Sequence, residues 1–366
     1  MHAEHKGLVI SVPWPLRLFG EYQDFLELPC VVMAADLRTA IVATPAEGEL
    51  SSIAAPGLAK PLSVKLDASV NLPALPGFAA ALRAVAGRGH PLTGAYDFRV
   101  VTNAPWFDRL PESPALLVGW IGIFLALNEA LVELSGQELA DIAIAARRDE
   151  PVFRRQIPEL YATTLGGTLR MQPGDALAAK PLERSMPGIV IGSIPNSTGD
   201  ALAAPIAEML KALLALKQSG AAFDVRKSTL EEVVPLLRKI SDAEAGLVYA
   251  QVRLRDICRE AVETLEFEEG FDDDKLGELL EESQAVLGDY LGLRDERIDA
   301  LIAAAVAGGA LGCKIIPGCA SFLAFAGGRA DEVLKAIRDV GGHARLANAT
   351  DGIRIEEHGC GCGGQH

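Results

Sequence analysis

The segment that decides the fold is PLRLFGEYQDFLELPCVV, residues 15–32. Short β-branched runs with proline beside them lie on either side of it, at 7–12 and 40–44, and predict two strands. The residues between these runs mix acidic, aromatic and apolar side chains. The sequence therefore predicts a polar, partly aromatic loop that joins two strands.

The composition around this segment is that of a folded, acidic protein. The chain has 366 residues, enough for roughly two domains of about 150 residues each. Hydrophobic residues make up 49% of it, so a sizeable core can form. Acidic residues number 49 and basic residues 34, which leaves a net charge of -15. This excess repels phosphates and anionic lipids, so we expect neither a nucleic acid nor a membrane as a partner.

The cysteines and the start of the chain predict a cytoplasmic protein. Cys30, Cys258, Cys313 and Cys319 are scattered singly, which indicates a reducing compartment rather than a disulfide framework. The first residues, MHAEHKG, lack the apolar region of a secretory signal. The longest uncharged apolar run, 115–127, is shorter than the ~20 residues that cross a bilayer and predicts a buried helix.

Helix start signals and composition divide the chain into two domains. Ser113 followed by Pro114 predicts a helix start, because the hydroxyl can accept from free amides and proline is tolerated at the first helical position. Thr229 and Glu232 have the spacing of a capping box. Strands and helices gathered in separate blocks predict a two-domain α+β protein, with domains at 1–185 and 186–357 and a tail at 358–366. Helices are expected at 78–86, 113–134, 137–147, 201–217, 229–240, 243–265, 276–290, 297–307 and 330–340, and further strands at 97–102, 188–193, 321–326 and 352–357.

Two more blocks follow the first segment in order: LADIAIAARRDEPVFRRQIPELYATTLGG at 139–167 and LGELLEESQAVLGDYLGLRDERIDALIAAAVAGGALGCKIIPGCASFLAFA at 276–326. Together the three blocks resemble the GHMP kinase superfamily, which includes galactokinase, homoserine kinase and mevalonate kinase, over nearly the whole chain. The resemblance implies an N-terminal ribosomal-protein-like α+β domain, a C-terminal ferredoxin-like α+β domain, and ATP and a small hydroxylated substrate between them. In such a kinase amides cradle the phosphates, a metal bridges them and a carboxylate accepts the hydroxyl proton.

The segment that matches the family's glycine-rich phosphate loop, 105–116, departs from it strongly. Its glycines are absent, and prolines remove two donor amides. Asp108 and Glu112 place carboxylates where a triphosphate would bind. A like-charge contact at about 4 Å costs roughly 1 to 4 kcal/mol. Of the loop's polar residues, Asp108, Arg109, Glu112 and Ser113 are the candidates for a degenerate phosphate site.

The metal and base positions of the family also change. Counted back from the glycine pair at 166–167, the catalytic Asp falls on Glu159 and the magnesium-binding Glu falls on Arg147. Glu159 can still accept a proton, whereas a guanidinium offers only donors and cannot bind a metal. We hypothesise that Arg147 pairs with Glu112 or Asp108, so that an internal ion pair fills the former nucleotide site.

The first and third motifs keep part of the family pattern. Glu21 and Asp24 match the family's sugar-contacting acids, while Arg17 and Tyr22 replace its Asn and His. The alternative interpretations are that Glu21 and Asp24 are loop acids that cap a turn and that Tyr22 is a packing residue. For Lys314 of the third motif, the alternative is a lysine on the surface. In the third motif Gly312 and Lys314 match, Gly318 lies in the turn, and the rest of the glycine run is lost.

The end of the chain carries a separate possibility. His358, Cys360, Cys362 and His366 can chelate a soft metal such as zinc or copper(I), but they lack the CxxC spacing of a structural zinc site. The alternative interpretation is a glycine-rich mobile tail with adventitious metal affinity.

These observations predict a degenerate GHMP kinase, a pseudokinase that binds a small polyhydroxylated or anionic ligand or serves as a regulator. No cofactor is expected for it. One alternative is an active ATP-dependent sugar-type kinase with Glu159 as the base, which would need ATP and magnesium. Another is a soft-metal-binding protein that uses the tail.

Overall fold

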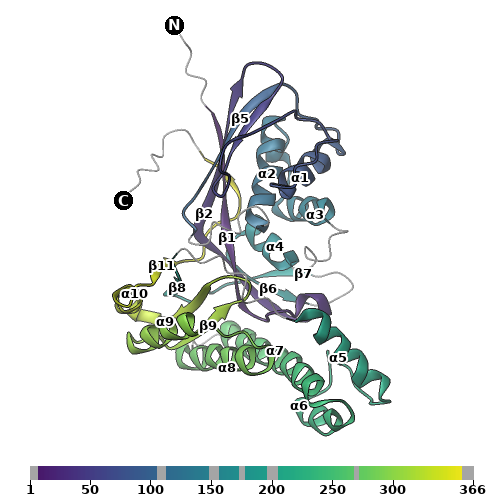
Figure 1. The fold of residues 1–366 in the computed structure, drawn as a ribbon, viewed down its shortest axis with the longest axis vertical. Coiled ribbons are helices and arrows are strands. Elements are labelled where there is room, and N and C mark those ends of the chain that lie inside the picture. Colours follow the sequence, from purple (N-terminus) through teal and green to yellow (C-terminus); the bar gives the residue numbers. More distant parts are fainter. Residues whose placement is uncertain are drawn as a thin grey trace. The chain divides into compact units, whose positions relative to one another are not determined.

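The structure is a computed structural model that describes residues 7–104, 113–147, 156–172, 178–195, 205–267 and 272–356. It divides into two compact units, each with its own sheet and helices (Figure 1). The domain limits expected from the sequence, which follow chain order, remain predictions. Unit 1 comprises Met1–Leu16, Met33–Gly167 and Ala349–His366, and unit 2 comprises Arg17–Val32 and Thr168–Asn348.

Unit 1 is built on a mostly antiparallel sheet with strand order β12-β1-β2-β5-β3-β4. Strand β2 pairs antiparallel with β5 from Thr39 opposite Thr102 to Ala46 opposite Ala95, and β3 runs parallel to β5. The strands are β1 Leu8–Phe19, β2 Cys30–Ala46, β3 Ser51–Ala54, β4 Leu62–Val64, β5 Ala95–Thr102 and β12 Arg354–Ile355.

The loop predicted between the first two strands is too long. Strands β1 and β2 together take up most of it, because their residues are buried almost without interruption and gain more from pairing than from solvation. The true connection is 20–29, with a short 3-10 helix at Asp24–Leu26. It closes at Gly20, whose φ is +84° and where a Cβ would lie 2.6 Å from the carbonyl oxygen of Pro29.

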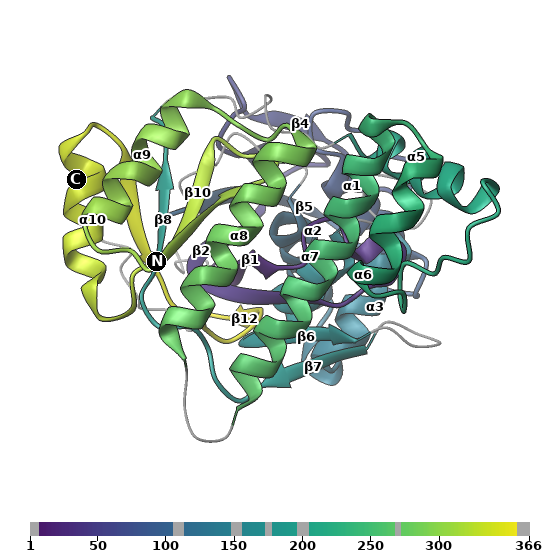
Figure 2. The ribbon, with the colours of Figure 1, turned by 90° about the horizontal axis from the view of Figure 1, so that it is seen from below.

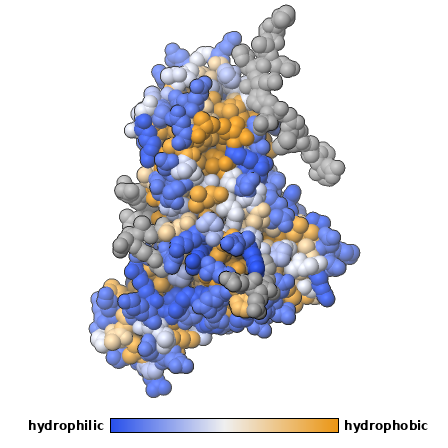
Figure 3. Space-filling view, turned by 180° about the vertical axis from the view of Figure 1, so that it is seen from behind, coloured by the Kyte–Doolittle hydropathy of each residue, from blue (hydrophilic) through white to orange (hydrophobic). Residues whose placement is uncertain are grey.

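Four helices cover one face of the unit 1 sheet, and α2 is the most deeply buried of them (Figure 1). The Ser113 hydroxyl accepts from the amide of Leu116, which confirms the predicted helix start. Trp120 and Phe124 of α2 pack edge-on against Phe78 of α1. In the view from behind, hydrophobic surface gathers over this unit (Figure 3). The helices are α1 Pro76–Ala86, α2 Pro114–Leu127, α3 Gly136–Ala146 and α4 Ile157–Leu165.

Helix α2 ends well before the predicted limit at 134. Its C-cap is Asn128, whose side-chain amide donates to the carbonyl of Phe124. The next residue, Glu129, has a φ of +58°, which an α-helix does not accommodate.

Unit 2 contains a four-stranded antiparallel sheet with strand order β11-β8-β10-β9 and the antiparallel hairpin of β6 and β7, whose strand β6 also pairs with β2. Strands β9 and β11 lie at the sheet's two edges and were absent from the expected strands. The strands are β6 Thr168–Gln172, β7 Ala178–Leu182, β8 Ile189–Ser193, β9 Gly312–Ile316, β10 Ser321–Phe325 and β11 His343–Ala347.

The helices of unit 2 include a long pair, α7 and α8, that lie side by side (Figure 2). The predicted helix 229–240 splits into α6 and a 3-10 stretch at Val234–Lys239, because Pro235 supplies no amide hydrogen. The capping box of Thr229 and Glu232 is confirmed. These helices are α5 Ile206–Gln218, α6 Leu230–Val233, α7 Asp242–Glu266, α8 Asp273–Leu291, α9 Glu296–Ala307 and α10 Ala330–Asp339.

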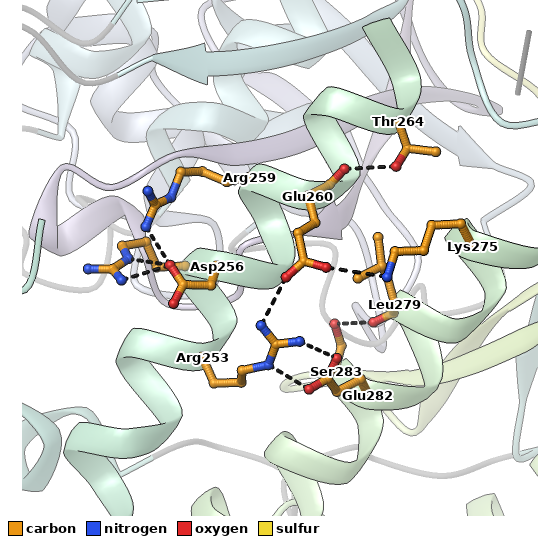
Figure 4. Close-up of polar contacts among 10 residues, drawn as sticks. Arg253, Asp256, Arg259, Glu260, Thr264, Lys275, Leu279, Glu282 and Ser283 are labelled. Carbon is orange, nitrogen blue, oxygen red and sulfur yellow. Dashed lines mark hydrogen bonds and ion pairs between the residues drawn. The ribbon is translucent and has the colours of Figure 1, made fainter. Parts of the chain in front are cut away.

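An ion-pair network joins α7 to α8 (Figure 4). Arg253 of α7 donates two hydrogen bonds to Glu282 of α8 and one to Glu260. Lys275 of α8 lies 3.3 Å from the other oxygen of Glu260. We call these four residues the α7–α8 network.

Among the described residues, no helix has the length and apolar character needed to cross a membrane.

Candidate functional site

The connection between β1 and β2 is held in shape by Arg17. Its Nη1 lies 2.7 Å from Oδ1 of Asp24 and 3.2 Å from the carbonyl oxygen of Gly20. The side chain of Asp24 is 1% exposed, so this ion pair is shielded from water. Tyr22, between the two acids, has a φ of +60° and is half-buried. Its backbone turns sharply here, which places Glu21 and Asp24 in the same buried loop.

Glu21 pairs with Lys314 of β9, a residue far away in the sequence. The side chain of Lys314 is 1% exposed and that of Glu21 is 2% exposed. The ammonium also lies 5.8 Å from the centre of the Phe19 ring. Burial, with Arg17 as a second cause, lowers the pKa of Lys314 well below its usual value. The interpretation of Lys314 as a surface lysine is therefore wrong, because β9 is buried on both of its faces at this point.

Two buried glutamines extend this cluster, and sequence reasoning missed both. Nε2 of Gln23 donates to the backbone oxygen of Gln251 on α7 at 3.3 Å and lies 3.4 Å from its side-chain oxygen. Both residues are 0% exposed. Gln23 stands between Glu21 and Asp24, the two acids that match the family motif, so its position in the sequence could have identified it. Gln251 lies inside a long amphipathic helix and gave no signal.

Three acceptor oxygens of this loop lack a donor. Within the described part of the chain, Oε2 of Glu21, Oε1 of Gln23 and Oδ2 of Asp24 are buried and have no hydrogen-bond partner. A buried acceptor without a donor costs roughly 1 to 3 kcal/mol, so native proteins rarely leave several together. We call Arg17, Glu21, Asp24 and Lys314 the loop cluster. Its free lone pairs suit a ligand that carries several hydroxyl donors.

The other residues predicted from the first and third motifs have plain structural places in unit 2. Gly312 begins β9 at a position where a Cβ would lie 2.1 Å from the carbonyl oxygen of Gly277 in α8. Gly318, with a φ of +77°, forms the turn between β9 and β10. Both positions therefore require glycine for backbone reasons.

The residues that match the phosphate loop and the base belong to unit 1. Ser113 is 5% exposed and its hydroxyl caps α2. Arg147 is the C-cap residue of α3 and is 8% exposed. Glu159 lies in the first turn of α4, whose C-cap is Gly166. The proposed partners of Arg147, Asp108 and Glu112, and their neighbour Arg109, lie outside the described residues.

The tail residues His358, Cys360, Cys362 and His366 also lie outside the described residues, so the soft-metal hypothesis stays a prediction. In the described part of the chain, no group of three or more His, Cys, Asp or Glu side chains could hold a metal ion. The four cysteines of the described part form no disulfide with one another. Burial raises the pKa of Cys258 and of Cys313 to about 12, so neither is a nucleophile.

Comparison of the whole chain with solved structures identifies the fold. A galactokinase from Lactococcus lactis, solved with galactose, superposes with a TM-score of 0.73 at 16% identity and covers 95% of each chain. The mevalonate kinase of Methanococcus jannaschii gives a TM-score of 0.68 at 14% identity, over 95% of this chain and 100% of that one. The chain has the two-domain α+β fold of the GHMP kinases.

A third GHMP-type structure, a D-glycero-D-manno-heptose 1-phosphate kinase from Bacteriodes thetaiotaomicron, gives a TM-score of 0.65 at 12% identity, over 96% of this chain and 100% of that one. No family model and no curated protein sequence matches the chain. The GHMP kinase fold is therefore preserved here although almost nine in ten residues differ from those of these structures.

Proposed function

We propose that this GHMP-kinase-like protein binds a small polyhydroxylated ligand through the loop cluster and has lost, or nearly lost, ATP-dependent phosphoryl transfer. The observation that carries the proposal is the set of three buried acceptor oxygens on Glu21, Gln23 and Asp24 without donors. The hydroxyls of a sugar or similar polyol supply donors in close sequence along one molecule. Arg17 contacts one oxygen of Asp24 and Lys314 contacts one oxygen of Glu21, so the second oxygen of each carboxylate is left to accept from a ligand.

The described residues at the nucleotide positions do not fit ATP with magnesium. Pro114 at the first position of α2 has no amide hydrogen, and the Ser113 hydroxyl is used as the helix cap. Arg147 occupies the position that matches the metal-binding Glu, and its guanidinium has no lone pair to give to a metal. These features support a site from which nucleotide binding has been lost.

A binding experiment on the full chain tests the proposal. Thermal-shift and calorimetric titrations would compare hexoses, inositols and alditols with MgATP and MgADP. Asp24→Asn should weaken binding of the active polyol by at least tenfold, because a charge-assisted hydrogen bond is worth about 1.5 to 3 kcal/mol. The matched control Glu282→Gln removes a carboxylate from the α7–α8 network and should leave affinity within twofold. If no polyol raises the melting temperature, the proposal is wrong.

A second candidate function is an active sugar-type kinase with Glu159 as the base. The position of Glu159 in the first turn of α4, at the matched distance from the Gly166 cap, favours it. Turnover of MgATP with a polyol, abolished by Glu159→Gln, would replace the pseudokinase proposal with this one. The soft-metal hypothesis is tested separately, since zinc titration of the full chain and of a chain cut after 357 should then give different heats.

A further inference from the structure

One end of the four-stranded sheet in unit 2 carries a row of polar residues. Ser193, the last residue of β8, lies directly opposite Ser321, the first residue of β10. On its other side Ser193 lies directly opposite His343, the first residue of β11. Residues paired in this way share a face of the sheet, with Cβ atoms about 4.5 to 5.5 Å apart. The three side chains therefore form one row across three strands.

The two serines in the row are nearly buried, and their hydroxyls make no hydrogen bond within the described chain. Ser193 is 4% exposed and Ser321 is 1% exposed. His343 at the end of the row is exposed. Neither serine oxygen is among the fully buried polar atoms that lack a partner, so both hydroxyls are open to water or to a ligand.

The strands and turns around the row carry basic residues and no acidic ones, in a chain that is strongly negative overall. None of the four strands contains an acidic residue, whereas they include Lys314, His343 and Arg345. The turns 317–320 and 341–342, which lead into β10 and β11, contain no acidic residue either. Arg345 lies two residues after His343, on the same face of the sheet, and is exposed. Within the described residues it makes no ion pair.

The row also lies close to the loop cluster. Lys314 pairs with Leu323 on β10, so Ser321 is its diagonal neighbour, about 7 to 8 Å away on the same face of the sheet. The polar row and the buried Glu21–Lys314 pair are therefore within the length of one small molecule.

We propose that Ser193, Ser321, His343 and Arg345 bind the phosphate group of a phosphorylated polyol whose hydroxyls meet Glu21 and Asp24. The inference rests on the proposed function and names its substrate class. All four side chains can donate hydrogen bonds, and the strands and turns that carry them contain no carboxylate. A phosphate monoester supplies several acceptor oxygens and the negative charge that a guanidinium prefers.

Equilibrium titration of the full chain with matched ligand pairs tests the inference. The pairs are hexoses and the same hexoses as 1- or 6-phosphates, with inorganic phosphate as a third probe. The wild-type chain should bind a phosphorylated member at least tenfold more tightly than its unphosphorylated partner. The double variant Ser193→Ala and Ser321→Ala should reduce that preference to within twofold and keep the affinity for the plain sugar. His343→Gln and Arg345→Gln should each reduce it by about threefold to tenfold.

Two control variants remove the same kinds of group elsewhere: Ser63→Ala on β4 and Arg99→Gln on β5, both exposed. They should leave every affinity unchanged. A wild-type chain that binds sugars without preferring their phosphates overturns the inference, as does a preference that survives in the double serine variant.

The proposed function fails by a different result. If no sugar binds but inorganic phosphate does, and the double serine variant abolishes phosphate binding, the row is an anion site and the loop cluster is not a polyol site. If phosphate does not bind either, both proposals are wrong.

Discussion

The loop cluster and the α7–α8 network use similar ion pairs in two different environments. In the loop cluster the side chains of Glu21 and Lys314 are 2% and 1% exposed, and three oxygens of the loop remain without donors. In the α7–α8 network the carboxylates of Glu260 and Glu282 are 36% and 40% exposed. The buried charges of the loop cluster therefore cost stability, whereas the exposed charges of the α7–α8 network add to it.

The difference between these two groups of ion pairs indicates which part of the chain is the candidate functional site. Hydrogen bonds from Arg253 to Glu282 raise the pKa of Arg253, as expected for a cation stabilised by its partners. Burial lowers the pKa of Lys314, as expected for a cation held in an environment that disfavours it. A strained arrangement of this kind persists where a ligand or a specific structure requires it.

The largest effect is expected for Lys314→Met. The variant leaves the Glu21 carboxylate buried without its counter-charge, which should lower the free energy of unfolding by about 3 to 5 kcal/mol. Urea denaturation measures the change. The double variant with Glu21→Gln should recover part of the loss, because the uncompensated charge is then gone. If the single variant lost less than about 1 kcal/mol of unfolding free energy, the Glu21–Lys314 pair would behave like the exposed pairs of the α7–α8 network. That result would overturn the distinction between buried and exposed pairs.

Arg255 and Arg253 make a matched pair for the next comparison, since both lie on α7 two residues apart. Arg255 is 1% exposed and donates to the carbonyl oxygens of Val225 and Ser228 at 2.6 and 2.9 Å. Arg255→Met leaves both carbonyls without donors and should cost about 2 to 4 kcal/mol. Arg255 also pairs with Asp256, so thermal unfolding measured with and without 1 M salt should show a loss of which salt alters only the smaller part.

Arg253→Met should cost less, about 1 kcal/mol, because its partners Glu260 and Glu282 remain open to water. The cost should also shrink at 1 M salt, where charges are screened over about 3 Å. Equal losses for the two arginine variants, or a salt-independent loss for Arg253→Met, would contradict the distinction drawn from burial.

The smallest effect is expected for Asp273→Asn at the start of α8, and it should be stabilising. Burial and the neighbouring Asp274 and Asp272 raise the pKa of Asp273. An acid whose pKa is higher in the folded chain loses stability as the pH rises through that pKa, and the Asn variant escapes the loss. The gain at pH 7 should stay below about 0.5 kcal/mol because water screens the group. It should vanish near pH 3; a gain of equal size at both pH values would refute the electrostatic cause.

Short-range chemistry in the chain was enough to predict the helix starts and part of the candidate site. The cap at Ser113 and the capping box at Thr229 depend on side chains within three residues of each other, so spacing predicts them. The resemblance of the three blocks predicted the α+β fold and directed attention to Glu21 and Asp24. Those residues do share one buried loop.

Contacts between distant segments decided the remaining features. The β-propensity of the residues did not predict how far β1 and β2 extend. Residues with only a weak preference for strands lie in these two because pairing with neighbouring strands and burial stabilise them there. The Glu21–Lys314 pair and the row of Ser193, Ser321 and His343 join residues that chain order keeps far apart. Such neighbours arise only when the sheet's strand order and register form, since no local interaction specifies which strand lies beside which.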